Sequence, residues 1–203
     1  MYHSFSDFAE LRKSCVSSLQ NISPEDLKNA INQIVETFAN NGQLYICGNG
    51  GSAADAQHIA AEFINGMNHP NNLHLPAIAL TTDTSVLTAH SNDYNFHTVF
   101  EVQLKALAKP GDCALFLTTS GKSKNILKAI EYCVRIGLPS IVLTGENTNL
   151  DKFNLICIKI PAVDTQIIQE MSLIVEHYLC GEVITELRKF KINSDKGIKH
   201  DIN

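Results

Sequence analysis

Four side chains that can move protons or bind a metal ion stand at helical spacings in two separate parts of the sequence. His58 and Glu62 are four residues apart, and Gln169 and His177 are eight apart. Each separation brings the two side chains toward one side of an α-helix. A carboxylate and an imidazole can act as general base and acid, and a second histidine with an amide oxygen would complete a zinc site. By spacing alone, an ordinary structural role on a helix surface is the more common explanation of both pairs.

A glycine-rich segment, GNGGSA at residues 48–53, follows a short apolar run and precedes a helical pattern. Glycines let the backbone turn tightly and approach a ligand, and a helix start offers unpaired N–H groups to an anion. We therefore predict an anion site here, with a tight turn lacking a ligand as the alternative. The segment also fits the dinucleotide pattern G-x-G-x-x-A, but the acidic residue expected about 20 positions later would be Asp83, which comes too late.

A second loop, TTSGKS at residues 118–123, also joins an apolar run to a helical pattern. Its hydroxyl groups and the N–H groups of a helix start suit a phosphate or a carboxylate; a plain capped turn is the alternative. The G-K-S triplet does not belong to a nucleotide-binding P-loop, because that motif requires a glycine where this chain has Phe116.

The elements that must position these residues alternate along the chain. Apolar runs typical of strands covered on both faces lie at residues 44–47, 77–80, 113–117, 140–143 and 155–158. Helical patterns lie at residues 5–20, 24–40, 52–65, 93–108, 122–136 and 165–189. This order predicts an α/β fold: a three-layer αβα sandwich with a central parallel five-stranded sheet, in a single domain over residues 1–190. Residues 191–203 are predicted to form a polar, frayed tail.

Composition excludes several classes of function. The 203 residues carry a net charge of -5 without a long basic run, so nucleic acid is not an expected partner. No apolar run approaches the length of a membrane span, and the first residues lack the apolar core of a signal peptide. The six cysteines include no C-x-x-C pair and are expected as free thiols in a reducing cytoplasm. The apolar stripe of the first helix needs a burial partner, for which another subunit is a candidate.

Three segments resemble phosphoheptose isomerases, a family with the SIS (sugar isomerase) domain. They are GNGGSAADAQHIAAE at residues 48–62, TSGKS at 119–123, where the family usually has S-T-S-G-N-S, and TQIIQE at 165–170 with His177 seven residues further on. The resemblance keeps its order and spacing over roughly residues 5–190. It implies a single flavodoxin-like SIS domain whose N-terminal helices take part in oligomerisation.

The activity implied by the resemblance is aldose–ketose isomerisation of D-sedoheptulose 7-phosphate to D-glycero-D-manno-heptose 7-phosphate, for lipopolysaccharide, capsule or a related glycan. Glu62 and His177 match the catalytic pair, and His58, Glu62, Gln169 and His177 match positions that often carry zinc, one ion per subunit. The positions that match substrate-binding residues are Asn49, Gly50, Gly51, Ser52, Asn92, Asp93, Thr118, Thr119, Ser120, Ser123 and Gln169. The family is a homotetramer with active sites between subunits.

The chain departs from the family pattern at several positions. Gly66 and Met67 stand where an arginine often follows the matched glutamate, Ile167 replaces another arginine, and Ser172 replaces a histidine. An SIS relative, the replication-initiator-associating protein, has the same loops and works by protein contact, which makes a phosphosugar-binding or initiator-associating protein the alternative function. That relative lacks the glutamate and the final histidine, whereas this chain has Glu62 and His177.

Overall fold

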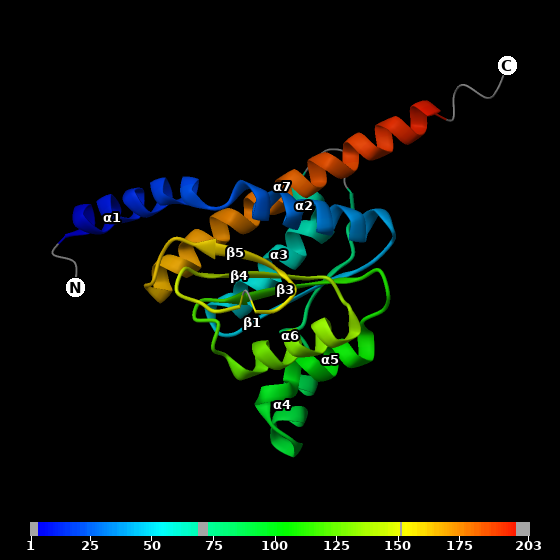
Figure 1. Ribbon diagram of the computed structural model, residues 1–203, viewed down its shortest axis with the longest axis horizontal. Helices are drawn as coiled ribbons and strands as arrows, with labels where there is room; N and C mark the ends of the chain where they lie inside the picture. Colours follow the sequence, from blue (N-terminus) through cyan, green and yellow to red (C-terminus); the bar gives the residue numbers. More distant parts are fainter. Residues whose placement is uncertain (1–3, 69–72, 151, 198–203) are drawn as a thin grey trace.

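Five parallel strands form the centre of the molecule (Figure 1). The structure, a computed structural model, describes residues 4–68, 73–150 and 152–197. The strands are β1 (Leu44–Gly48), β2 (Ala77–Ala79), β3 (Cys113–Thr118), β4 (Ser140–Gly145) and β5 (Ile156–Ile160), and their order in the sheet is β2-β1-β3-β4-β5. The predicted α/β fold with a parallel five-stranded sheet is confirmed.

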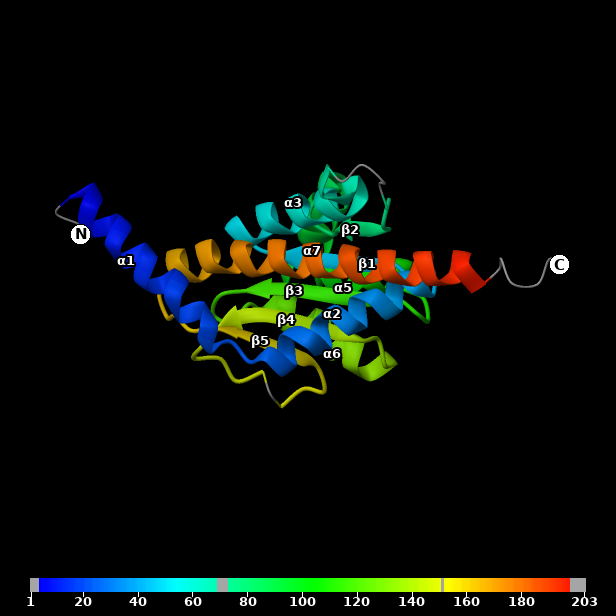
Figure 2. The same ribbon diagram turned by 90° about the horizontal axis from the view of Figure 1, so that it is seen from above.

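Helices cover both faces of this sheet, as Figures 1 and 2 show. They are α1 (Phe5–Ser18), α2 (Pro24–Ala39), α3 (Gly51–Asn65), α4 (Thr84–Asp93), α5 (Val99–Leu107), α6 (Lys124–Ile136) and α7 (Thr165–Gly197). Helices α2, α3 and α7 pack on one face, and α5 and α6 on the other. None of the helices in the described part of the chain is long and apolar enough to span a membrane.

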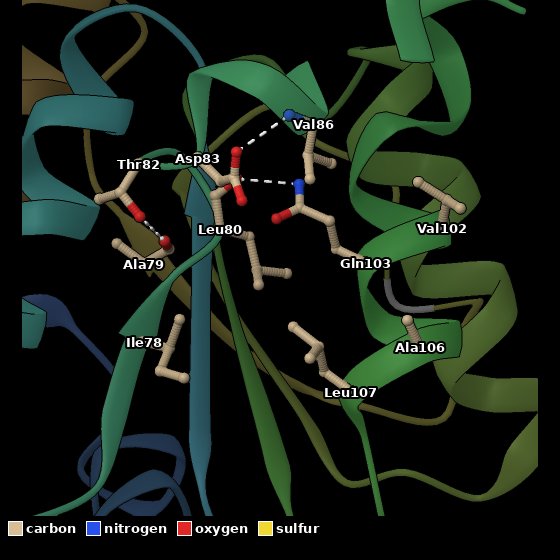
Figure 3. A pocket seen from close by; sticks show the side chains of 10 residues that line it. All are labelled: Ile78, Ala79, Leu80, Thr82, Asp83, Val86, Val102, Gln103, Ala106 and Leu107. Carbon is tan, nitrogen blue, oxygen red and sulfur yellow. Dashed lines mark hydrogen bonds between the residues drawn. The ribbon is translucent and has the colours of Figure 1, made fainter. Parts of the chain in front are cut away.

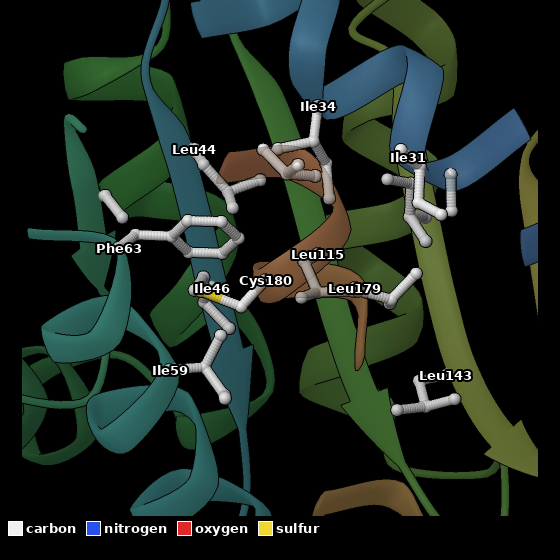
Figure 4. Packing of buried hydrophobic residues seen from close by; sticks show 14 of the residues in the cluster. Ile31, Ile34, Leu44, Ile46, Ile59, Phe63, Leu115, Leu143, Leu179 and Cys180 are labelled. Carbon is white, nitrogen blue, oxygen red and sulfur yellow. The ribbon is translucent and has the colours of Figure 1, made fainter. Parts of the chain in front are cut away.

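The strands alternate between two hydrophobic cores because successive side chains of a strand point to opposite faces. In β1, Leu44 and Ile46 face α2, α3 and α7, and Tyr45 and Cys47 face α5 and α6. Figure 4 shows the first core, where Phe63 of α3 lies beside Leu44 and Ile46. Apolar residues on both sides leave no polar alternation in the sequence, which is why the strands were recognisable as buried runs.

Local capping explains where two of the helices begin. At the start of α2, the Ser23 side chain accepts a hydrogen bond from the Asp26 N–H at 3.2 Å, and Pro24 occupies the first turn. A proline is tolerated there because its missing N–H has no partner in the helix. Asp83 Oδ1 accepts from the Val86 N–H at 3.0 Å and caps α4 in the same way.

Two sequence-based boundaries were wrong. Helix α4 was not predicted, and the helix expected at 93–108 is the shorter α5. Because α4 has no buried residue, its sequence lacks the apolar stripe that marks an amphipathic helix. Helix α7 continues to Gly197 where a frayed tail was expected from residue 191, since no glycine or proline interrupts residues 182–196.

Helix α1 extends beyond the sheet (Figure 2) and buries none of its residues. Phe5 is 83% exposed, and Leu11 and Val16 are 40% and 46% exposed. A polar contact joins the helix to the domain: Arg12 donates from Nε and Nη2 to the two carboxylate oxygens of Glu170 on α7, at 2.8 and 3.1 Å. The apolar side chains of α1 are therefore available to another surface.

Candidate active site

The two predicted anion loops meet in one pocket. Strands β1 and β3 are neighbours with Gly48 paired to Leu117, so the loops that follow them lie side by side at the carboxyl edge of the sheet. They enclose a cavity of about 240 Å³ with the first turns of α7. The lining residues are Asn49, Gly50, Gly51, Ser52, Leu117, Thr118, Thr119, Ser123, Thr165 and Gln169. This is the edge at which open parallel sheets bind ligands.

Glycine at position 51 is required by the contact between α3 and α7. A Cβ atom on Gly51 would lie 2.5 Å from Nε2 of Gln169, so any side chain there displaces the glutamine. Gly50 has a φ of +59°, a conformation that side-chain-bearing residues rarely adopt. The glycines therefore bring the loop backbone against Gln169, one of the residues predicted to bind substrate.

A pair of asparagines joins the two loops. Asn49 Nδ2 donates to Asn125 Oδ1 at 2.9 Å, and Asn125 Nδ2 donates back to Asn49 Oδ1 at 2.8 Å. Asn125 lies in the first turn of α6, is 3% exposed, and also accepts from the Ile126 N–H. Asn125 was not predicted as a site residue, because a polar residue at a helix start resembles a surface residue. Its position two residues after Ser123, beside the second loop, was the available signal.

The two histidines lie between α3 and α7, which run in parallel away from the pocket. Nε2 of His58 and Nε2 of His177 are 2.9 Å apart, and the rings meet edge to face with centroids 5.0 Å apart. One nitrogen donates and the other accepts, since only one proton can lie between them. The sequence therefore placed these two residues together correctly, although neither ring lines the 240 Å³ cavity.

Glu62 is half-buried on the same side of α3. The Cys180 thiol of α7 has its pKa raised to about 12, mainly by burial and partly by the negative charge of Glu62. The carboxylate is thus within electrostatic reach of α7, one turn beyond the histidine pair. Glu62 does not line the 240 Å³ cavity either.

Of the predicted zinc ligands, the structure brings the two histidines together. The two imidazole nitrogens converge on one point, as neighbouring zinc ligands do. Within the described ranges, however, no group of three or more His, Cys, Asp or Glu side chains is close enough to hold a metal ion. The donors suit zinc by chemistry, but Glu62 would have to move toward the histidines to complete the set.

An acidic pair beside the histidines was not anticipated from the sequence. Glu176 of α7 is 1% exposed, and neither of its carboxylate oxygens has a hydrogen-bond partner in the described structure. Burial, and to a lesser extent the charge of Asp55 on α3, raises the pKa of Glu176 to about 8. Burial also raises the pKa of Asp55, against the opposing effect of His58. A buried carboxyl next to His177 is expensive to maintain.

Three of the predicted substrate residues lie outside the pocket. Ser120 is exposed, and its hydroxyl accepts from the Lys122 N–H at 3.2 Å. Asn92 and Asp93 are exposed at the end of α4, where Asn92 Nδ2 donates to Asp93 Oδ1 at 2.8 Å. Figure 1 shows α4 projecting away from the sheet. Within this one chain, Asn92 and Asp93 therefore do not join the pocket.

A larger cavity of about 440 Å³ lies at the β2 edge of the sheet (Figure 3). Most of its lining is apolar, and its polar groups are already engaged in the protein. Asp83 caps α4, and Gln103 donates to the carbonyl oxygens of Leu80 and Val99, both at 3.0 Å. The carboxylate of Asp83 caps α4 and is therefore already engaged, whereas a dinucleotide site needs an acidic residue that binds the ribose. This cavity therefore gives no support to the dinucleotide alternative.

Comparison with known proteins agrees with this geometry. Residues 7–145 match the family model described as the SIS domain. A phosphoheptose isomerase from Roseiflexus sp. is 46% identical over 150 residues, covering 73% of this chain and 75% of that protein. One from Aliarcobacter butzleri is 44% identical over 166 residues, covering 80% and 86%.

Solved structures give the same result. A phosphoheptose isomerase from Neisseria gonorrhoeae is 35% identical with a TM-score of 0.79, covering 88% of this chain and 96% of that one. One from Francisella tularensis is 31% identical with a TM-score of 0.84, covering 89% and 96%. The fold is thus that of an SIS domain. Within the SIS proteins, the chain belongs to the phosphoheptose isomerase family.

Proposed function

We propose that this protein is an aldose–ketose isomerase that interconverts D-sedoheptulose 7-phosphate and D-glycero-D-manno-heptose 7-phosphate. The observation that carries the proposal is the pocket in which both anion loops meet Gln169, in a chain that belongs to the phosphoheptose isomerases. The product would supply heptose to lipopolysaccharide, capsule or a related glycan. A non-catalytic role in phosphosugar binding or in contact with a replication initiator is the alternative.

The phosphate group is assigned to the loop pocket. Ser52, Thr118, Thr119 and Ser123 offer hydroxyl groups there, and α3 and α6 begin at the same place. Unpaired N–H groups and the positive end of a helix dipole stabilise an anion. Holding the phosphate orients the reacting carbons and makes remote binding energy available to the chemical step.

Proton transfer is assigned to Glu62 and His177. Isomerisation removes a proton from the carbon beside the carbonyl and returns it to the neighbouring carbon through an enediol, which requires a carboxylate base and a group that protonates oxygen. Glu62 moves the carbon-bound proton, and His177 assists ring opening and shuttles the oxygen-bound proton. The short contact to His58 fixes the ring of His177 and its tautomer.

We also propose one zinc ion per subunit on His58, Glu62, Gln169 and His177. Support comes from the apposed imidazole nitrogens and from the nitrogen and oxygen donors in the set. When bound, zinc would polarise the substrate carbonyl. A carboxylate that held the ion would be a weaker base, so the proposed ligand and base roles of Glu62 would oppose each other.

The working unit is proposed to be a cytoplasmic homotetramer. Exposed apolar residues on α1 provide a surface for assembly. Asn92 and Asp93 lie away from the pocket of their own chain, which supports their contributing to the pocket of a neighbouring subunit.

The direct test incubates the purified protein with sedoheptulose 7-phosphate and measures the aldose product. Glu62→Gln and His177→Ala are expected to lower kcat by about 100-fold or more, the usual size of a general acid–base contribution. Glu36→Gln and His97→Ala, at exposed positions, serve as matched controls. Absence of product with the wild-type protein would refute the isomerase assignment for this sugar, and unaltered turnover of both variants would refute the residue assignment.

Metal dependence is tested on the same preparations. The zinc content of wild type, His58→Ala and His177→Ala is measured by mass spectrometry, and activity is followed during chelation and zinc return. About one zinc ion per wild-type subunit and a tenfold or greater loss of affinity in each variant are expected. Full activity of protein shown to be free of metal would make zinc unnecessary for the reaction.

A further inference from the structure

The loop pocket has no charged side chain of its own. The ten residues that line it, all from the described part of the chain, are uncharged. A sugar phosphate carries close to two negative charges at neutral pH. Hydroxyl and N–H donors satisfy its oxygens, but a cation close by is needed to balance the charge when the group leaves bulk water.

Lys122, like Lys124, is a cation next in sequence to the lining residue Ser123. It belongs to the loop that joins β3 to α6, between the lining residues Thr119 and Ser123. Its N–H donates to Ser120 Oγ at 3.2 Å, and Gly121 before it adopts a φ of +62° against Thr148. The backbone of Lys122 is therefore held by the loop, whereas its side chain is exposed to solvent.

The ammonium group of Lys122 is not used in an internal ion pair. No carboxylate of the described ranges lies within ion-pair distance of it. Lysines elsewhere on this face do have such partners: Lys105 is 2.7 Å from Glu101, and Lys128 is 2.9 Å from Glu131. The ammonium group of Lys122 is thus available to a group that comes from outside the chain.

The position of Lys122 is unfavourable without an anion. It precedes the N-terminal end of α6, and Lys124 begins that helix. Cations at this end oppose the helix dipole, and no acidic residue lies in the first turn of α6 to compensate. A bound phosphate makes this arrangement favourable, because the positive end of the helix dipole and both ammonium groups then attract the same negative charge.

We propose that Lys122 pairs with the phosphate group of a substrate bound in this pocket. The inference deepens the proposed function and rests on it. A lysine acts on phosphate as a point charge on a flexible stem, so the exposed side chain can close over a phosphate held by Thr119 and Ser123.

Because the phosphate is bound equally in the ground state and the transition state, Lys122 is expected to affect substrate binding and not the chemical step. Lys122→Met should raise the KM for the heptose phosphate about tenfold at low salt and leave kcat nearly unchanged, consistent with one charge-assisted contact. Lys122→Arg should restore most of the affinity, since the charge is kept.

The control is Lys109→Met, which removes the same charge from an exposed lysine before β3, at the opposite edge of the sheet. It should behave as wild type. The metal content of all preparations is compared first, so that a difference in binding is not a difference in zinc.

Binding of inorganic phosphate, measured by titration calorimetry, separates this inference from the proposed function. Lys122→Met should bind phosphate about tenfold more weakly than wild type and Lys109→Met, and the difference should shrink in high salt. Equal phosphate affinity of Lys122→Met and wild type would overturn the role of Lys122, whether or not the protein isomerises heptose. Weaker phosphate binding together with absent isomerase activity would support Lys122 and refute the heptose reaction.

Discussion

Glu176 shows how a single buried residue can make stability depend on pH. Its pKa is raised to about 8 in the folded protein from an ordinary value of 4.5, so the folded state binds the proton more tightly than the unfolded state. The stabilising effect of this proton is fully present below pH 4.5 and is lost as pH rises through about 8. Charging Glu176 above that pH costs stability, because its oxygens have no partner.

Glu176→Gln should remove this pH dependence. The substitution is expected to stabilise the protein by roughly 1–3 kcal/mol more at pH 8.5 than at pH 5, measured by chemical denaturation at both values. Glu36→Gln, at an exposed position of α2, should show no such difference. An equal effect of Glu176→Gln at both pH values would mean that the carboxyl titrates normally.

Replacement by alanine is expected to have different effects at Gly48 and at Gly51. In Gly51→Ala the new Cβ meets the end of the Gln169 side chain at 2.5 Å, whereas in Gly48→Ala it meets the Ser52 backbone oxygen at 2.5 Å. A side chain can move aside and a backbone cannot. Gly48→Ala should therefore destabilise the fold by about 1–3 kcal/mol, seen in thermal unfolding.

Gly51→Ala should leave the melting temperature near that of wild type but lower kcat/KM about tenfold or more, because Gln169 is displaced from its position. Steady-state kinetics beside the unfolding curve measures both effects. A variant that unfolds early, or one with wild-type kcat/KM, would contradict the contact between Gly51 and Gln169.

The site residues that could be predicted from the sequence are those whose residue type is unusual at their position in the chain. Glycines and hydroxyls clustered after buried strands predicted the pocket, and the structure gathers Asn49 to Ser52 with Thr118, Thr119 and Ser123. Asn125 and Glu176 were not predictable in this way, because a polar residue in a helical pattern is usually solvated. Their burial depends on which helix packs against them.

At the scale of elements, the Arg12–Glu170 pair links the exposed helix α1 to the helix that carries the site. Glu170 directly follows Gln169, so α1 contacts α7 where it reaches the pocket. Arg12 is 12% exposed and Glu170 40% exposed, a setting in which solvent weakens an ion pair.

Arg12→Gln should loosen α1 without unfolding the sheet. Amide hydrogen exchange over residues 5–18 is expected to become about threefold to fivefold faster, corresponding to the loss of up to about 1 kcal/mol. Exchange in β1 and β3 should stay as in wild type. Unchanged exchange in α1 would show that other contacts hold it.

The strands and the long helices could be predicted closely because burial leaves a pattern in the sequence. Each strand is a continuous apolar run, and each long helix carries an apolar stripe. Helix α4 could not, since it buries none of its residues and is set by the cap at Asp83 and its place after β2. Helix α7 ends at Gly197 and not at the predicted residue 189. The polar residues after 189 do not end it, because a helix ends where its backbone is interrupted.

At the scale of the whole molecule, a monomer leaves the apolar side of α1 in water. Wild-type protein is therefore expected to behave as a tetramer of the 22.3 kDa chain in light scattering. Phe5→Ser combined with Leu11→Ser should shift it toward smaller species, because these side chains are 83% and 40% exposed in the single chain.

Leu107→Ser is the matched control, since Leu107 is 43% exposed at the β2-edge cavity. A tetramer that survives the double substitution would place the assembly surface elsewhere. Dissociation caused by the control alone would locate that surface at the β2 edge. In the sequence, the proposed tetramer rests on the family resemblance, because an exposed stripe does not identify its partner.

The reciprocal contact between Asn49 and Asn125 also bears on how the chain folds during its synthesis. The two residues are 76 positions apart, and α3, β2, α4, α5 and β3 all lie between them. Contacts between such distant segments form late and slowly when a chain folds. On the ribosome, the pocket would gain its last side, Gln169, only after four-fifths of the chain had been made. A chain that stops before Gln169 would therefore lack one side of the pocket, and binding of a sugar phosphate would report that the chain has been made and folded at least as far as that residue.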